Sequence, residues 1–576
     1  MLYFLFVWTI LVCCCTPIGA AVLNWCNADC FDRQGDRFIV SVWLGILSLS
    51  VTLLAISLFL PLSPWVGAVI APLLLFISLL SPSTRKELGQ VYLRFPPGII
   101  LAGFSLAVII AAFTSQKIVW FDTGLYHLGT IRWLSTFGAV PGVALINLKF
   151  GFTSSWFALS APLSPALLGE RIGAVTNGFI FLVANLQFLI AGSNLRTKTA
   201  RFSDWFLTVT SGLVILIYTV TALTGSPILI SFSSDVTITF LIIITAWTIL
   251  KISESQDQFV SEQQNRFDAR IIPLILTAGA VTVKLSALPL LPVGLLYYSL
   301  APQLNFRKQA QRALAGAGVS FLILFPVFTV ATVTSGCPLY PSQAICFDLP
   351  WTVTEEMADN EIKEIQFWWK FDPTESTETE PAVTEGFLPS FWNWLFHAKK
   401  PQMILVLTLI SGVGAIWSLL KPSYKRIPAE FWLVGIGVLG SLFVLTQSPL
   451  LRYGLGYFTL VPCFMAAVSF QSIFARLKIQ LRPQLLLLLP LFLTGLILAG
   501  SITEDIKSRL LLPAEIRSVK LVAGRINDVN YVYPDRRKIR CWLSNLPCTP
   551  LPLGRYEIQL REPSQGIKAG FVHSVD

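Results

Sequence analysis

Apolar stretches of about 20 residues recur along most of the chain and alternate with short polar loops. Each stretch is long enough to cross the roughly 30 Å hydrocarbon layer of a membrane. Inside a bilayer such segments must be helices, because no water is present to satisfy their backbone groups. The pattern therefore predicts an all-α polytopic membrane protein with about 13–14 transmembrane helices. We place the spans at 1–22, 38–60, 64–80, 97–115, 172–192, 205–223, 237–252, 270–284, 285–300, 312–334, 402–420, 431–447, 455–475 and 483–502.

Composition agrees with this pattern, since 54% of the 576 residues are hydrophobic and only 13% are charged. The net charge of +10 is carried mainly by short loops between spans, and no basic stripe with interleaved aromatic residues is present, so a nucleic-acid partner is not expected. Counting the spans puts all the basic loops on one side, which the positive-inside rule makes cytoplasmic. These loops lie at 85–94, 196–201, 251–270, 307–312, 421–426 and 476–482.

The opposite side then holds two large outer loops, 116–171 and 335–401, and a C-terminal tail. We divide the chain into N-terminal transmembrane helices (1–96), a transmembrane core (97–502) and an extracytoplasmic tail (503–576). Short runs such as "NYVYP" and "YEIQL" predict that this tail is a small α/β region. Because the cytoplasmic loops are short and poor in reactive side chains, we expect function on the outer side.

The outer loop "WFDTGLYHLGTIRW" brings Asp122, Tyr126 and His127 together where a span ends. Asp122 is a candidate general base or metal ligand, and the alternative is that it only caps the amphipathic helix that follows. Tyr126 and His127 are candidate substrate-binding residues. Trp133 and Trp156 are interpreted as interfacial anchors on two short surface helices joined by turns.

Three further outer positions carry charge next to apolar spans. Asp235 in "SFSSDVTITF" either binds substrate or caps its helix with help from the preceding serines. Lys284 interrupts the apolar stretch "VTVKLSALPL", where a charge usually marks a site or an internal partner such as Asp235. Arg452 and Tyr453 in "QSPLLRYGLGYF" are either phosphate-binding residues or headgroup anchors.

The second outer loop begins with "SGCPLYPSQAIC" and continues into an acidic tract. Tyr340 in this segment either borders the site or belongs to a Pro-Tyr-Pro turn. Two cysteine pairs lie on the outer side at close spacing, which makes them disulfide candidates in an oxidising compartment. They are Cys337 with Cys346 and Cys541 with Cys548.

No phosphate-cradling loop, nucleophile elbow or HExxH motif occurs, so ATP hydrolysis is not expected. An outward Asp directly after a span, short surface helices in the first large outer loop, many spans and an outer tail resemble the GT-C superfamily of integral-membrane glycosyltransferases. The sequence of the segment from "DTGLYHL" to "SSWF" is also similar to that of a group of bacterial polytopic membrane proteins that includes cyanobacterial ones. The architectural resemblance covers residues 97–500, and its specific motif is one loop.

The resemblance implies a GT-C-like fold in the bacterial inner (plasma) membrane, with the active face periplasmic. It implies transfer of a sugar from a polyprenyl-phosphate donor to an acceptor hydroxyl of a glycan, lipid or protein, with inversion and with Asp122 as base. This loop follows the fourth predicted span, whereas the superfamily places it after the first. The second adjacent acid of the superfamily is also missing here, so we expect no cofactor and favour a mechanism without a divalent metal.

Other functions remain open from the sequence. A transporter or flippase would explain Lys284 and the Gly- and Pro-broken spans, although no repeated halves are visible. A polymerase or ligase of lipid-linked glycans would act on related substrates, and a structural subunit would leave Asp122 as a cap. If the enzyme hypothesis holds, Asp122, Lys284 and Arg452 should meet at one outer site.

Overall fold

The computed structural model describes most of the chain, and the fold is stated here for the described residues. The undescribed residues are 92–96, 165–167, 170, 196–199, 226, 257–266, 301–303, 368–391, 393–398, 421–427, 478–483, 517, 536–538, 554–557 and 575–576. The acidic tract of the second outer loop therefore lies outside the described residues. Of the six basic loops, only the one at 307–312 is described throughout.

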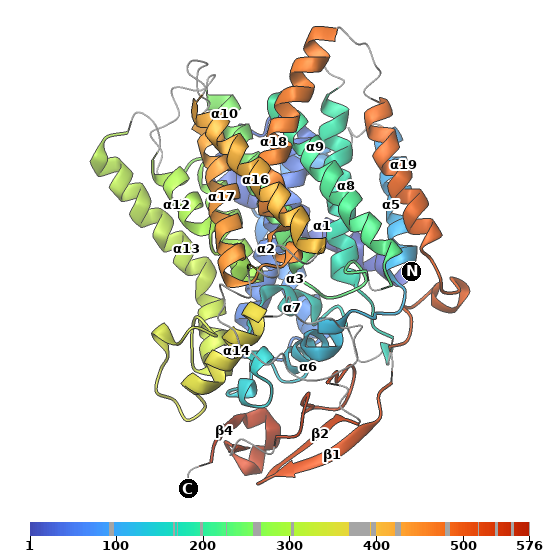
Figure 1. Cartoon of the computed structure of the whole chain (residues 1–576), viewed down its shortest axis with the longest axis vertical. Coiled ribbons are helices and arrows are strands. Elements are labelled where there is room, and N and C mark those ends of the chain that lie inside the picture. The colour runs from blue at the N-terminus through green and yellow to red at the C-terminus, as the bar shows by residue number, and fades with distance from the viewer. Residues whose placement is uncertain are drawn as a thin grey trace.

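The protein is mostly helical, and its long helices run side by side along the long axis of the molecule (Figure 1). The long and intermediate α-helices are α1 (Leu2–Trp25), α2 (Gln34–Ile56), α3 (Pro64–Leu79), α4 (Pro82–Val91), α5 (Pro97–Thr114), α8 (Val175–Asn194), α9 (Phe202–Val220), α10 (Asp235–Gln256), α11 (Ile271–Val283), α12 (Leu290–Ser299), α13 (Phe306–Ser335), α14 (Glu355–Phe367), α16 (Lys399–Leu420), α17 (Pro428–Gln447), α18 (Leu451–Leu477) and α19 (Gln484–Gly500).

Nine helices among the described residues are long and apolar enough to cross a membrane, and a tenth span is possible if the bent pair α3 and α4 is counted as one. The chain is thus an integral membrane protein of the polytopic helical class. The predicted spans all coincide with helices, but several are shorter than predicted. Helices α3 and α4 meet at a 98° bend, and α11 and α12 have only 13 and 10 residues.

The two ends of the helix bundle differ. The tail strands lie at one end, below α6, α7 and α14 in Figure 1, and we call this the tail end. Arg33, in the connection between α1 and α2, pairs with Asp204 of α9 at the opposite end, which we call the basic-loop end. Helix α10 runs from the tail end to the basic-loop end. It begins at Asp235, at the tail end, and Lys251, at the basic-loop end, lies 16 residues later, about 24 Å along the helix.

Short helices form the first large loop: the π-helical turn η1 (Thr123–His127), α6 (Leu128–Thr136), the 3-10 helices η2 (Val143–Leu145) and η3 (Leu148–Gly151), and α7 (Ser155–Ser160). Every residue of α7 is buried. The interfacial-anchor interpretation of Trp133 and Trp156 was wrong, since these residues are 3% and 0% exposed. Trp133 is buried because it packs with Phe571 of the tail and with residues of the loop after α13, whereas Trp156 is buried because α7 packs against α2 in the core of the helix bundle.

The tail holds two small antiparallel sheets, with β1 (Leu521–Ile526) on β2 (Val529–Pro534) and β3 (Ile558–Leu560) on β4 (Phe571–His573). Asn527 has a φ of 50° in the two-residue connection from β1 to β2, a conformation that tight hairpins require. Apart from the strands, the described tail residues form only the 3-10 helices η9 (Lys507–Arg509) and η10 (Pro563–Ala569). The predicted α/β tail is therefore built from strands and 3-10 turns.

Candidate functional site

Asp122 lies at the end of the segment that leaves α5, immediately before the turn η1. Its side chain makes no capping hydrogen bond to that turn. Instead, the Nη1 of Arg452 donates a hydrogen bond of 2.8 Å to Oδ2 of Asp122. Arg452 occupies the first turn of α18, 330 residues further along the chain. Asp122 is thus held by a charge partner from a distant helix, and the cap hypothesis does not account for its carboxylate.

Asp235 and Lys284 form a second ion pair, which lies beside the pair of Asp122 and Arg452. Helix α11 ends at Val283, and Lys284 is extended, with a φ of −161°, before the 3-10 helix η6 (Leu285–Ala287). This break in the helix frees the Lys284 side chain to reach Asp235. The hydroxyl of Ser233 donates a 2.9 Å hydrogen bond to Oδ2 of Asp235. The internal partner considered for Lys284 from the sequence is therefore present.

The two ion pairs are joined into one group, because Nε of Arg452 lies 3.8 Å from Oδ2 of Asp235. We call Asp122, Asp235, Lys284 and Arg452 the tail-end charge cluster. Tyr453 belongs to its surroundings: its hydroxyl accepts a 3.0 Å hydrogen bond from Nη2 of Arg452. The Lys284 ammonium lies 3.9 Å from the centre of the Tyr453 ring. Residues from four separate parts of the chain thus meet at one place.

Exposure is uneven within the cluster. The side chains of Lys284 and Arg452 are 26% and 19% exposed, whereas Asp235 is 2% exposed. Asp122 is intermediate, at 10%. The cations therefore retain surface that an incoming anion can reach, while Asp235 is enclosed behind them.

The pKa of Asp122 reflects these surroundings. Burial acts to raise the pKa of this carboxyl, but the charges of Arg452 and Lys284 and the hydrogen bond from Arg452 outweigh burial and lower it. Asp122 is thus an ionised carboxylate at neutral pH. The pKa of Tyr126 is raised well above its usual value, first by burial and then by the nearby Asp122 carboxylate. Tyr126 therefore keeps its proton.

His127 is enclosed directly beside the cluster and is only 2% exposed. Its Nδ1 lies 3.2 Å from the Thr123 hydroxyl, and its ring centre is 5.1 Å from that of Phe157. Burial lowers the pKa of His127 to about 4 against the opposing effect of Asp122. The imidazole is therefore neutral at pH 7, so it offers a hydrogen bond and no positive charge.

Tyr340 lies in a different group from the other predicted site residues. Its ring packs on Gly151 and on Phe152, whose ring centre is 5.1 Å away. Burial raises the pKa of Tyr340, and the carboxylate of Glu361 adds to the effect. Glu361 pairs with Lys149 at 2.9 Å. The structure thus associates Tyr340 with the Lys149–Glu361 pair and not with the tail-end charge cluster.

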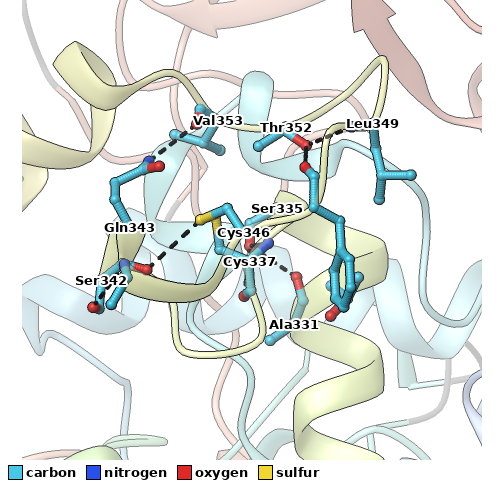
Figure 2. The surroundings of a disulfide bond; sticks show 12 residues. Ala331, Ser335, Cys337, Ser342, Gln343, Cys346, Leu349, Thr352 and Val353 are labelled. Carbon is cyan, nitrogen blue, oxygen red and sulfur yellow. Dashed lines mark hydrogen bonds between the residues drawn. A yellow bond between two sulfur atoms is a disulfide. The ribbon is translucent and has the colours of Figure 1, made fainter.

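Both expected cysteine pairs form disulfides in the structure. Cys337 and Cys346 join the two ends of the turn after α13 (Figure 2), and Cys541 and Cys548 close a loop in the tail. Figure 2 shows Cys346 above the carbonyl of Ser342 and the Cys337 amide near Ser335. The second disulfide matters more for the site, because its loop contacts the turn that carries Asp122.

Several side chains around the site gave no recognisable signal in the sequence. The Thr123 hydroxyl lies between the His127 ring and the Phe232 amide, and Arg452 lies 5.4 Å from the Trp120 ring centre. The amide of Trp542 donates a 3.0 Å hydrogen bond to the carbonyl of Gly124. Only proximity in sequence to Asp122 pointed to Trp120 and Thr123, and nothing pointed to Trp542.

A second ionic group, which was not predicted from the sequence, lies at the basic-loop end. Asp36 accepts from Nε of Arg33 at 2.7 Å, and Nζ of Lys251 lies 2.5 Å from it. Arg33 also makes two hydrogen bonds to Asp204, of 2.9 and 2.5 Å. The side chains of Lys251, Asp36 and Asp204 are at most 1% exposed. We call Arg33, Asp36, Asp204 and Lys251 the basic-end charge cluster.

The described residues contain no group of three or more His, Cys, Asp and Glu side chains arranged to hold a metal ion. The tail-end charge cluster itself offers the ionised Asp122 carboxylate beside two partly exposed cations, Lys284 and Arg452.

Comparison with known proteins places the chain in a family and identifies no individual relative. No curated protein and no solved structure matches the chain. A family model described as "Domain of unknown function (DUF8201)" matches residues 1–459, which include every member of both charge clusters and exclude the tail. The chain therefore belongs to the DUF8201 family.

Proposed function

We propose that the protein is a membrane glycosyltransferase of the GT-C type. It transfers a sugar from a polyprenyl-phosphate donor to an acceptor hydroxyl at the tail end, with Asp122 as general base. The observation that carries the proposal is the 2.8 Å pair between Asp122 and Arg452 inside a cluster that also contains Lys284. A base and two cations at one membrane surface are the groups that transfer from a lipid phosphate requires.

The two cations suit the phosphate of such a donor. Arg452 offers a planar guanidinium that can make paired hydrogen bonds to phosphate oxygens, and Lys284 adds a compact positive charge. Both are partly exposed, and Asp235 behind them is held by Lys284 and Ser233. An entering phosphate would therefore displace Asp122 from Arg452 more readily than it would displace Asp235 from Lys284.

The charge balance of the cluster matches the reaction. Two carboxylates and two cations sum to zero, and the donor phosphodiester carries one negative charge. The acceptor oxygen forms a bond to the anomeric carbon on the face opposite the phosphate, the bond from that carbon to the phosphate oxygen breaks, and the acceptor proton moves to Asp122. The cluster gains one positive charge as the lipid phosphate gains one negative charge. This single displacement inverts the anomeric centre.

The lowered pKa of Asp122 makes it a weak base while it is paired with Arg452. When the donor phosphate takes over Arg452, Asp122 loses its strongest favourable charge interaction and its pKa rises. Donor binding thus prepares the base, and we expect the donor to bind before the acceptor hydroxyl is deprotonated. Neutral His127 and protonated Tyr126 would supply hydrogen bonds to the sugar or phosphate.

The wider architecture also supports the proposal. An acidic residue in the first large loop, many membrane-spanning helices and a tail over that loop are features of the GT-C superfamily. The basic loops favour an extracytoplasmic tail end by the positive-inside rule, and the resemblance implies that the membrane is a bacterial inner membrane.

The test uses purified protein in lipid nanodiscs with labelled polyprenyl-phosphate sugars. Asp122→Asn should lower transfer by about 100- to 10,000-fold, because the amide cannot accept the proton. The same variant should still bind polyprenyl phosphate. Arg452→Gln should lose both transfer and binding, the latter measured as the rise in thermal stability that a ligand produces, about 2.7 kcal/mol at 100 times its Kd.

Arg171→Gln is the matched control, because Arg171 pairs with exposed Glu515 near the same end and lies outside the cluster. It should transfer and bind as the natural chain does. Normal transfer by folded Asp122→Asn protein would overturn the assignment of the base. Movement of a lipid-linked glycan across vesicles without any transfer would favour the flippase alternative.

A further inference from the structure

A loop of the tail, closed by the disulfide between Cys541 and Cys548, lies directly against the turn that carries Asp122. The amide of Trp542 donates a 3.0 Å hydrogen bond to the Gly124 carbonyl. The Trp542 ring covers Gly124 so closely that a Cβ at this position would lie 2.7–2.9 Å from three ring atoms. Trp542 is only 4% exposed, although it belongs to a small outer region.

Two further contacts attach this loop on either side of Gly124. The Arg540 guanidinium lies 5.3 Å from the centre of the Phe121 ring, next to Asp122. Arg132 of α6 donates a hydrogen bond to the Ser544 carbonyl. The loop thus contacts residues before, within and after the segment that presents Asp122, Tyr126 and His127.

The loop itself is held from the other side by the tail hairpin. The Val532 amide of β2 donates to the Pro547 carbonyl at 3.0 Å, and the Thr549 amide donates back to Val532 at 3.0 Å. Together with the disulfide, these bonds connect Trp542 to the β1–β2 sheet. Motion of the Asp122 turn away from the bundle is therefore opposed by an element that begins more than 400 residues later in the chain.

We propose that the Cys541–Cys548 loop is a positioning element of the candidate site and that Trp542 is its positioning residue. The loop acts on the base and not on the cations, because its contacts are to residues 121, 124 and 132, whereas Lys284 and Arg452 belong to other elements. Oxidation of the two cysteines then becomes a condition for an ordered base. The kinetic part of this inference rests on the proposed glycosyl transfer, and the structural part does not.

Hydrogen–deuterium exchange of the full-length protein in nanodiscs tests the structural part. Trp542→Ala and the double variant Cys541→Ser/Cys548→Ser should raise deuterium uptake in peptides that cover 121–134. Trp542→Phe should restore much of the protection, because it keeps an apolar ring over Gly124. The control Cys337→Ser/Cys346→Ser removes the other disulfide, whose loop packs near Trp133, and should leave uptake in 121–125 unchanged. Unchanged uptake in the Trp542→Ala and Cys541→Ser/Cys548→Ser proteins would overturn the proposal.

A pair of compensating substitutions separates positioning from general stability. Gly124→Ala adds a methyl group that collides with the Trp542 ring, and Trp542→Leu removes the ring. Each single variant should lower kcat by about 10- to 100-fold, as expected for a displaced catalytic group, while KM for the lipid donor changes little. The double variant should recover part of kcat, because the leucine leaves room for the methyl group.

Independent, multiplicative losses in the double variant would contradict the kinetic part, as would a change confined to KM. If the natural chain transfers no sugar at all, the proposed function fails. The exchange experiment still decides whether the tail loop orders the Asp122 turn.

Discussion

The two ends of helix α10 carry two charge clusters of opposite character. The tail-end cluster pairs two acids with two cations, and its cations are 19–26% exposed. The basic-end cluster encloses Lys251, Asp36 and Asp204 at no more than 1% exposure. In the first cluster an outside anion can reach the cations. In the second, Lys251, Asp36 and Asp204 are shielded from solvent and paired within the protein, and the exposed surface is confined to Arg33, at 19%.

This difference indicates that the basic-end charge cluster holds helices together, whereas the tail-end charge cluster is a candidate site. Asp36 and Asp204 share Arg33 and also Asn194, whose amide lies 3.2 and 3.3 Å from their oxygens. These bonds tie α2 to the last residue of α8 and to the first turn of α9, and Lys251 adds α10. Opening such a group would leave buried charges without partners, which is costly. Asp122, by contrast, has one strong partner, Arg452, and exchanging that partner for a phosphate keeps every charge paired.

The largest effect on stability is expected at the basic-loop end. Lys251→Met removes a buried cation from Asp36 and should lower the free energy of unfolding by about 3–5 kcal/mol, measured by thermal unfolding in detergent. Arg201→Ala is the control, because its pair with Asp32 is half exposed and should contribute at most about 1 kcal/mol. Equal losses in both variants would show that burial does not distinguish the pairs.

The second prediction concerns the pH dependence of folding stability that His127 produces at the tail end. The chain has three histidines, of which His127 lies in the turn next to Asp122 and His573 lies in β4 of the tail. Unfolded His127 binds a proton near pH 6.5 but the folded protein binds it only near pH 4. The unfolded state therefore binds more protons in this window, and stability should fall by up to about 3 kcal/mol as pH drops from 6.5 to 4.

The lowered pKa of Asp122 also makes the folded state less stable as the pH falls. Its stabilising charge is present above the unfolded pKa of 3.8 and is lost as the pH falls through the folded pKa. Thermal unfolding of the natural chain and of His127→Gln across pH 4–7 checks the histidine contribution. The variant should lose the slope between pH 6.5 and 4. Identical slopes in the two proteins would mean that His127 is not a buried neutral imidazole.

The smallest effect is expected at Thr123, where neutral hydrogen bonds support the Asp122 turn. Thr123→Val keeps the shape but removes the hydroxyl that lies 3.2 Å from His127 and accepts from the Phe232 amide at 3.4 Å. The free energy of unfolding should fall by about 1 kcal/mol, because two buried groups lose a partner. Thr329→Val, in α13, removes only a bond to the backbone of its own helix and is the control. A loss of 3 kcal/mol or more, on the order of that at Lys251, would place the turn among the main supports of the fold.

Much of the architecture could be predicted from local pattern. The predicted spans coincide with helices because apolar runs of this length have few alternatives in a bilayer. The disulfide pairs follow from short spacings, of 9 and 7 residues. The polar residues at 122, 235, 284 and 452 stood out because they interrupt apolar sequence. Burial was predicted less well: Trp133 and Trp156 look like interfacial residues, but Trp133 is covered by the tail and the loop after α13, and Trp156 is packed inside the helix bundle.

The sequence by itself determined that this protein is a polytopic membrane protein and where its helices lie. It also singled out the few charged residues that interrupt or border its apolar segments. Only the tertiary structure decided that Asp122 meets Arg452 and that Trp542 covers Gly124. Hydrophobic periodicity depends on neighbours a few residues away, and a single chain reveals it directly. An ion pair between residues that are 330 positions apart depends instead on how whole helices pack, and the local sequence around either residue does not reveal that packing.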